Sequence, residues 1–268
     1  MKLLEGKNAV IFGVANNRSI AWGIAQAFHE HGANVGISYA GEMMEKRARP
    51  LAESLGLTFV EPCDVSKDDD ITAVAEKAKA HFGQVDILVH AIAFAPREAL
   101  SGDFHQTSRE DFRVALDISA YSFIGLARAF LPILRPGASL MSMTYYAAEK
   151  VVPNYNVMAI AKAALENITR YLAGDLGKHG VRVNAISAGP IRTLAAAGVS
   201  GFRGLYKRFA EVSPLRQEIT IEDVGGAAVF LASDLSSKVS GEILYVDGGF
   251  NIVAIAEDSP DAGGEGGE

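Results

Sequence analysis

The sequence predicts an α/β fold in which one parallel sheet of seven strands is covered by helices on both faces. Short apolar runs rich in valine and isoleucine recur along the chain, and segments with helical apolar spacing, such as Ile20, Ile24, Ala27 and Phe28, separate them. No Pro/Gly-rich linker interrupts this alternation before residue 256. Since crossovers between parallel strands are right-handed, the pattern favours a Rossmann-type doubly wound sheet in a single domain.

The expected strands follow one another at regular intervals. They are NAVIF from Asn8, NVGIS from Asn34, TFVEP from Thr58, VDILVHA from Val85, ASLMSM from Ala138, VRVNAIS from Val181 and EILYVD from Glu242. We therefore expect residues 1–256 to form a dinucleotide-binding domain. Residues 257–268, acidic and rich in glycine, are expected to form a flexible tail.

Composition narrows the classes of function. With 25 Lys and Arg against 32 Asp and Glu, the net charge of −7 disfavours nucleic acid as a partner. No apolar run reaches about 18 residues, so a membrane-spanning helix is not expected, and the start lacks a signal-peptide cleavage site. The single cysteine, Cys63, excludes an intramolecular disulfide and fits a reducing compartment. The expected location is the cytoplasm.

The turn after the first strand, GVANNRSIAWG, has the features of a phosphate-binding loop. Gly13 permits a sharp turn, and Ser19 is placed to cap a helix that begins near Ile20. The N-terminus of that helix would offer free N–H groups to a pyrophosphate. A strict GxGxxG is absent, so a plain βα turn with a helix cap is the alternative, but the position after the first strand favours cofactor binding.

The next three strand ends bear on the cofactor. Residues 38–41 supply neither the acid that holds an NAD ribose nor the arginine that holds an NADP phosphate, and the missing cation favours NADH. Asp64, in the sequence CDV, would accept a hydrogen bond from adenine or cap the following helix. The small residues of HAIAFAP, which ends the fourth strand, would let a cofactor approach the backbone.

The fifth strand and the helix after it carry the candidate catalytic group. In a helix, seven residues turn 700°, so Tyr155 and Lys162 would lie ~20° apart on one face. A lysine beside the phenol would lower its pKa and strengthen it as a donor. The alternative is a packing tyrosine and a solvated lysine. Tyr145 and Tyr146 end the strand nearby, and this clustering at the carboxyl edge of the sheet favours an active site.

Several motifs together resemble one known family. They are GVANNRSIAWGIA, CDV, DISAYSF, NYNVMAIAKAALE, GVRVNAISAGPIRTLAA, TIEDVG and SGEILYVDGGF, and they extend to about Ile252. The chain resembles the short-chain dehydrogenases/reductases and, more narrowly, the bacterial enoyl-(acyl carrier protein) reductases of type II fatty acid synthesis. Most of the superfamily has a tyrosine four residues before the lysine, where this chain has Met158, and a serine where it has Tyr145. This departure is itself the enoyl reductase pattern, with Tyr155 one turn further back.

The resemblance implies an NADH-dependent oxidoreductase that reduces the double bond of a trans-2-enoyl group on acyl carrier protein, and that works as a homotetramer. In such an enzyme Tyr155 would hydrogen-bond the enolate oxygen, Lys162 would hold the nicotinamide ribose, and Tyr145 would be a third catalytic residue. Substrate would contact Ala95, Tyr145 and Tyr155, and no metal is expected. The implied cofactor-binding residues are Gly13, Ser19, Ile20, Asp64, Val65, Ile92, Lys162, Ile191, Arg192, Thr193, Leu194 and Ala195. Position 40 departs from the family, because Ala40 cannot meet the adenine ribose.

Two alternatives remain at this stage. A carbonyl-reducing short-chain dehydrogenase would share the fold and the cofactor, but Met158 argues against it. A non-catalytic dinucleotide sensor would keep the cofactor loops and lose the donor pair, whereas Tyr155 and Lys162 are both present.

Residues 192–217 interrupt the alternation and predict a substrate lid. Glycines 198, 201 and 204 suggest mobility, and apolar side chains would cover an acyl chain, namely those of Leu194, Phe202, Leu205 and Phe209. The segment also carries five cations, Arg192, Arg203, Lys207, Arg208 and Arg216, against Glu211 alone. Although a single charge usually lies on a solvated face, this excess predicts a docking patch for the acidic carrier protein.

Overall fold

The computed structural model describes residues 2–194, 196 and 202–255, with the backbone alone at 202, 203 and 205. Within these residues seven strands form one sheet in the order β3-β2-β1-β4-β5-β6-β7, and every neighbouring pair is parallel. The strands are β1 (Asn8–Phe12), β2 (Asn34–Tyr39), β3 (Phe59–Pro62), β4 (Val85–His90), β5 (Leu134–Thr144), β6 (Arg182–Ala188) and β7 (Ile243–Val246). The predicted Rossmann-type sheet is confirmed.

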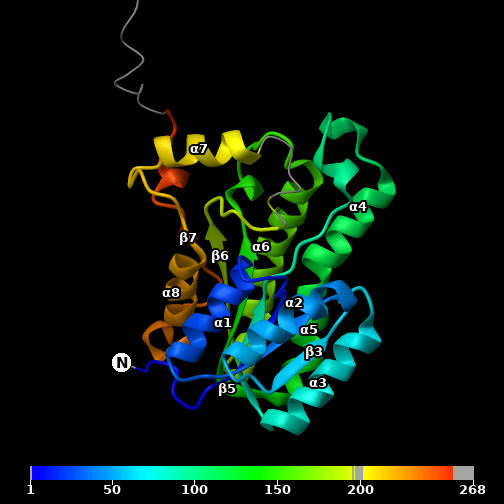
Figure 1. Ribbon diagram of the computed structural model, residues 1–268, viewed down its shortest axis with the longest axis vertical. Coiled ribbons are helices and arrows are strands. Elements are labelled where there is room, and N and C mark those ends of the chain that lie inside the picture. The colour runs from blue at the N-terminus through cyan, green and yellow to red at the C-terminus, as the bar shows by residue number, and fades with distance from the viewer. Residues whose placement is uncertain (1, 195, 197–201, 256–268) are drawn as a thin grey trace, which may run out of the picture.

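The helices lie between the strands, as the alternating pattern predicts. They are α1 (Ile20–Glu30), α2 (Gly41–Ser54), α3 (Asp68–Phe82), α4 (Arg109–Leu116), α5 (Ser122–Phe130), α6 (Asn156–Leu176), α7 (Phe202–Val212) and α8 (Ile221–Ala232). Figure 1 shows α7 lying across one end of the molecule, beyond the arrowhead of β6. The carboxyl edge of the sheet therefore faces α7.

Each strand sends alternate side chains to opposite faces, and each face has its own core. Ala9 and Ile11 of β1 pack in the cluster formed with α1, α2 and α8. Val10 and Phe12 of the same strand pack with α3, α5 and α6. Because both faces are covered, the strands read as continuous apolar runs without alternation.

The winding of the chain changes direction between β1 and β4. From β1 the sheet grows through β2 and β3 to one side, and through β4 to β7 on the other. In the register of this pair Phe12 lies opposite His90, so Gly13 and Ala91 leave the sheet side by side. In open α/β sheets this switch point is where ligands bind.

The segment Arg109–Ile133 is continuous helix, with a π-helical turn at Asp117–Tyr121 between α4 and α5. It has the length and hydropathy of a membrane-spanning helix, but half of its most apolar stretch is buried inside the protein. Packing against α3 and α6 accounts for this apolar composition.

Two boundaries differ from the prediction. Strand β5 begins at Leu134 rather than Ala138, because Pro136 and Gly137 interrupt the apolar pattern at an irregularity in the β4–β5 pairing. Helix α6 begins at Asn156, so Tyr155 is its N-cap rather than part of its first turn. The proposed lid is described in part, and the proposed tail 257–268 lies outside the described residues.

Helices α1 and α8 pack closely enough to require glycine on both. A Cβ at Gly225 would lie 2.9 Å from the Cβ of Ala27 and 3.0 Å from the carbonyl oxygen of Gly23. A Cβ at Gly23 would lie 2.6 Å from the carbonyl oxygen of Ile221. The packing of α1 against α8 therefore depends on glycine at both positions.

Replacing Gly225 with alanine is expected to lower the free energy of unfolding by ~1–3 kcal/mol, because the added methyl group forces the two helices apart. Gly226→Ala is the matched control, because no atom lies within 4 Å of its added Cβ. That variant is expected to gain up to about 1 kcal/mol from helix propensity. Urea denaturation followed by circular dichroism measures both, and equal stability of the two variants would contradict the close contact.

Candidate functional site

The switch point between β1 and β4 provides backbone without side chains. Gly13 has φ +102°, and a Cβ there would clash with the carbonyl group of Ala91 and lie 3.4 Å from Cγ1 of Ile92. The structure thus brings Gly13 and Ile92 together, two residues predicted to bind cofactor. Glycine is required here because the Ala91 backbone packs against it, and the switch point itself is the place where ligands bind in sheets of this type.

The next predicted contact, at the start of α1, is arranged differently from the prediction. Ser19 is the N-cap residue, but its side chain makes no capping hydrogen bond. Its Oγ donates to the carbonyl oxygen of Asn16 at 2.7 Å instead. The N–H groups at the start of the helix, where Ile20 is the first residue, are consequently not capped by Ser19. An anionic phosphate suits such a helix end.

Asp64, after β3, does not cap the following helix. Its Oδ1 accepts from the backbone N–H and the hydroxyl of Ser66, and its Oδ2 lies 3.2 Å from Nζ of Lys67. These contacts, led by the Ser66 hydroxyl, lower the pKa of the carboxyl group, so Asp64 is an ionised acceptor. Its predicted partner Val65 is buried in the core on the α3 side of the sheet.

The segment after β6 begins buried and becomes exposed. Ile191 is buried, Thr193 donates its N–H to the Ile191 carbonyl at 2.7 Å, and Leu194 is exposed. Arg192 pairs with Glu218 at 3.3 Å and places its guanidinium 4.3 Å from the centre of the Tyr206 ring. The fifth predicted residue here, Ala195, lies outside the described residues.

A hydrogen-bonded group links the end of β2 to α2. Arg49 donates through Nη2 to the hydroxyl of Tyr39 at 3.2 Å and through Nε to Glu45 at 2.6 Å. The sequence pattern gave no sign of this triad, because its members lie on a strand and on two turns of α2. Arg49 is thus held by a carboxylate beside the end of β2.

The candidate catalytic tyrosines meet at the end of β5. The ring centroids of Tyr145 and Tyr155 are 5.0 Å apart, with the ring planes at 63°. Tyr155 packs against a small cluster that contains Ala95, Leu100 and Met158. The three residues predicted to contact substrate, Ala95, Tyr145 and Tyr155, are therefore brought together.

The expected lowering of the tyrosine pKa by lysine is not found. Burial, with a smaller contribution from Tyr145, raises the pKa of Tyr155, and burial alone raises that of Tyr145 to about 12. Both phenols are protonated at neutral pH and are hydrogen-bond donors. Lys162 is buried, and its Nζ donates to the carbonyl oxygen of Met143 at 2.7 Å. Burial lowers the pKa of Lys162 to about 8.

Polar residues that the sequence analysis missed surround this group. His90, at the end of β4, is fully buried and bonds the hydroxyl of Ser122 through Nε2 at 2.8 Å. Burial first, and then Lys162, lower its pKa to about 3, so the imidazole is neutral. Its position at a strand end was a usable signal, but the partner is 32 residues away. Glu166, one turn after Lys162, is also buried.

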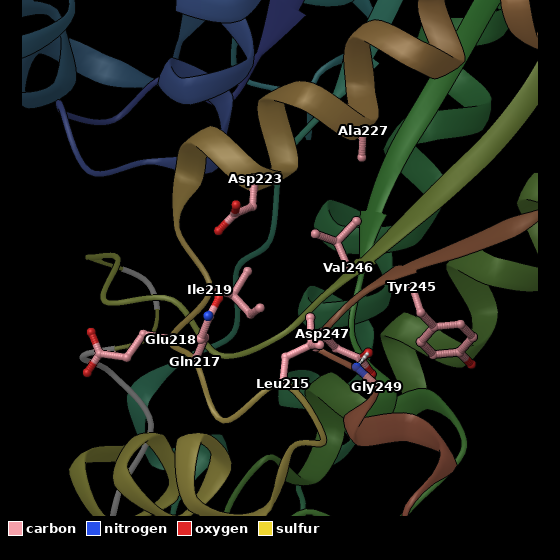
Figure 2. A pocket seen from close by; sticks show the side chains of 11 residues that line it. Leu215, Gln217, Glu218, Ile219, Asp223, Ala227, Tyr245, Val246, Asp247 and Gly249 are labelled. Carbon is pink, nitrogen blue, oxygen red and sulfur yellow. Dashed lines mark hydrogen bonds between the residues drawn. The ribbon is translucent and has the colours of Figure 1, made fainter.

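A cavity of about 380 Å³ lies away from these residues. Its lining includes none of the predicted site residues, and Figure 2 shows Asp223 on α8 at one side and Leu215 at another. Asp223 is held by Thr220 in a capping box, and Asp247 accepts from the N–H groups of Gly249 and Asn251. Its acidic groups are thus already bound within the protein, and the candidate active site lies elsewhere.

The chain is similar to proteins of one activity over nearly its whole length. A family model described as enoyl-(acyl carrier protein) reductase matches residues 13–251. The enoyl-(acyl carrier protein) reductase (NADH) of Aquifex aeolicus is 51% identical over 95% of each chain. The crystal structure of the Bacillus cereus enoyl-acyl carrier protein reductase with NADP+ has a TM-score of 0.93 and 48% identity, over 95% of this chain and 100% of that one. The reductase of Anaplasma phagocytophilum in complex with NAD has a TM-score of 0.91 and 45% identity over 97% of each chain.

Proposed function

The chain belongs to the enoyl-(acyl carrier protein) reductase family, and from that membership we propose how its own side chains carry the reaction. It reduces the carbon–carbon double bond of trans-2-enoyl-(acyl carrier protein) with NADH in fatty acid elongation. The observation that carries the proposed roles is the ring contact of two protonated tyrosines, Tyr145 and Tyr155, at the end of β5, where buried Lys162 also bonds the Met143 carbonyl.

Tyr155 is the proposed donor to the substrate. Bound NADH supplies the hydride, which reaches the β-carbon of the enoyl group, and negative charge then accumulates on the thioester oxygen. A donor placed at that oxygen stabilises the transition state. The raised pKa of Tyr155 suits this role, because the phenol keeps its proton until the charge develops. Tyr145, in ring contact with it, orients the phenol and lines the site.

The proposed cofactor contacts follow the strand ends. Gly13 and the N-terminus of α1 would hold the pyrophosphate, Asp64 and Val65 the adenine, and Ile92 the ribose beside it. Lys162 would turn its remaining ammonium hydrogens to the nicotinamide ribose, since one already bonds the Met143 carbonyl. Residues Ile191–Leu194 would complete the site on the β6 side. Each of these roles is what membership of the family implies for the residue at that position.

Tyr155→Phe is expected to lower turnover of a crotonyl thioester by about 10²–10³, the usual cost of one donor to a developing oxyanion. NADH affinity is expected to stay close to that of the wild type, because the proposed role is toward substrate. The assay follows oxidation of NADH and NADPH side by side, with the greater rate expected for NADH.

Tyr171→Phe is the matched control for that experiment. It removes a phenol hydroxyl from the same helix, but its side chain is 76% exposed to solvent. Turnover of this variant is expected to equal that of the wild type, and Tyr145→Phe is expected to lose less than Tyr155→Phe. Full activity of Tyr155→Phe would remove the residue from the mechanism.

The carrier protein is proposed to dock on α7. Lys207 and Arg208 are exposed and share Glu211, at 3.8 and 3.7 Å, so two cations face one carboxylate. Arg192 is bound to Glu218 and Tyr206, which removes it from the predicted patch. Arg203 lies on the same helix by sequence. The proposed docking surface is therefore formed by Arg203, Lys207 and Arg208. These residues lie within the proposed lid, residues 192–217.

Replacing Arg203, Lys207 and Arg208 with glutamate is expected to raise KM for a carrier-linked substrate, most strongly at low salt, since such charges act on encounter rate. KM for a coenzyme A thioester is expected to change little. The control is Lys178→Glu with Lys238→Glu, two exposed cations outside α7. Equal losses on both substrates would assign the segment to lid closure alone.

A homotetramer is the proposed assembly. Apolar or aromatic side chains are exposed on two separate surfaces: Phe112, Tyr121 and Ile160 on α4 to α6, and Ile252 and Ile255 near the C-terminus. Figure 1 shows α4 and the C-terminal segment on opposite sides of the molecule. Two self-complementary surfaces generate a closed assembly of four copies, and burial of both removes these patches from water.

Light scattering at micromolar concentration is expected to give four times the mass of one chain. Ile252→Asp combined with Ile255→Asp is expected to halve that mass by blocking one of the two surfaces. Leu235→Asp, which changes an exposed aliphatic residue elsewhere on the surface, is the control and is expected to leave the mass unchanged. A monomeric wild type would contradict the proposal.

The cytoplasm is the proposed location. Cys63, the one cysteine of the chain, is a buried free thiol, which needs no oxidising compartment. Burial, aided by Asp70 and Asp64, raises the pKa of this thiol to about 12, so it is a neutral core residue.

A further inference from the structure

Helix α6 buries a carboxylate that has no assigned role. Glu166 lies one turn after Lys162 and is 4% exposed, while Lys162 is 5% exposed. A buried charge without partners is costly, and replacing a buried pair with apolar residues is often neutral or stabilising. Stability alone therefore does not explain why two opposite charges lie under the end of β5.

The contacts of this pair run to two consecutive residues of one strand. Lys162 donates to the carbonyl oxygen of Met143 at 2.7 Å, and the Thr144 hydroxyl donates to Oε1 of Glu166 at 2.8 Å. Tyr145 follows directly in the chain, and its ring packs on Tyr155, the N-cap residue of α6. The hydrogen bonds between α6 and the end of β5 therefore fix how Tyr145 lies relative to Tyr155.

We propose that Glu166 is a positioning residue for the reductase reaction: it fixes Tyr145 through Thr144 and keeps Lys162 cationic. The proposal rests on the roles proposed above for Tyr145, Tyr155 and Lys162. Glu166 itself touches neither substrate nor cofactor in this scheme. It acts on Tyr145 through its bond to Thr144, and on Lys162 through the charge of its carboxylate.

The charges around the pair agree with this role. His90 of β4 faces Lys162 and is neutral. Burial lowers the pKa of Lys162 to about 8, and the Glu166 carboxylate is the group that opposes this shift. Glu166 in turn is faced by Thr144 of β5, by Arg170 of α6 at 3.8 Å, by Glu149 and by Tyr245 of β7. Burial raises the pKa of Glu166, and Thr144, Arg170 and Lys162 act against that rise.

The sign of the pH dependence follows from these contacts. Lys162 is cationic below its pKa of about 8 and becomes neutral as the pH rises through it. Removing the carboxylate lowers that pKa further, so the cation is lost at a lower pH. The alkaline limb of any property that needs the cation then moves toward neutral pH.

Two substitutions separate the two roles. Glu166→Gln keeps an oxygen for Thr144 but removes the charge. In this variant, kcat/KM for a crotonyl thioester and NADH affinity are both expected to fall with rising pH, as in the wild type. The pH at which this alkaline limb begins is expected to be lower by at least about half a pH unit. Thr144→Val keeps the charge but removes the hydroxyl. It is expected to keep the wild-type limb while kcat falls about fivefold.

Asp175→Asn is the matched control, because it removes an exposed carboxylate from the same helix that pairs with Lys178 rather than with Thr144 or Lys162. It is expected to keep the wild-type limb. A Glu166→Gln profile that overlays the wild type would overturn the electrostatic role, and an unchanged kcat in Thr144→Val would overturn the positional one. If Glu166→Gln does not fold, as judged by circular dichroism, Thr144→Val still decides the positional role.

NADH binding distinguishes this inference from the proposed function. Affinity against pH, followed by NADH fluorescence, needs no enoyl turnover. Lys162→Ala is expected to weaken that affinity and to abolish its alkaline limb. A wild type that binds NADH with this limb but does not reduce the thioester would contradict the proposed function, while the effect of Glu166 on the charge of Lys162 would still stand.

Discussion

The reversal of winding between β1 and β4 is the constraint on which the site depends. Parallel strands leave all their carboxyl ends on one edge, and at the reversal two of those ends diverge to opposite faces. Gly13 packs so closely on the Ala91 backbone that a Cβ there would clash with the Ala91 carbonyl oxygen, so glycine is required for these two strand ends to meet. The proposed cofactor site is at this junction, and the proposed catalytic tyrosines follow β5 at the same edge of the sheet.

Polar contacts within the core hold the ionisable side chains near the carboxyl edge of the sheet in place. Lys162, Glu166 and His90 are all buried, and each is bonded to a strand end or a helix of the α3 side. Desolvation moves their proton affinities away from the usual values, and it also raises those of Tyr145 and Tyr155. This suits the role proposed for Tyr155, because a phenol that keeps its proton at neutral pH can donate it to a developing oxyanion.

The sequence predicted those parts of the structure that produce a periodic pattern of apolar residues. Strand runs and helical spacing predicted the sheet, whereas the inference from the seven-residue interval between Tyr155 and Lys162 assumed a helix that in fact begins one residue after Tyr155. Contacts to backbone carbonyl groups produce no such pattern. The bonds of Ser19 to Asn16 and of Lys162 to Met143 were therefore missed, as was the start of β5 at Leu134. His90 and Ser122, distant in sequence, meet only once the sheet is formed.

The apolar helix Arg109–Ile133 has a consequence for synthesis of the protein. Its covering partner α6 ends roughly forty residues later, a stretch that a ribosome adds in about two to eight seconds at about 5–20 residues per second. During that interval the apolar side chains of this segment that pack on α6 lack their partner. Their burial from water is therefore completed only when α6 has been made.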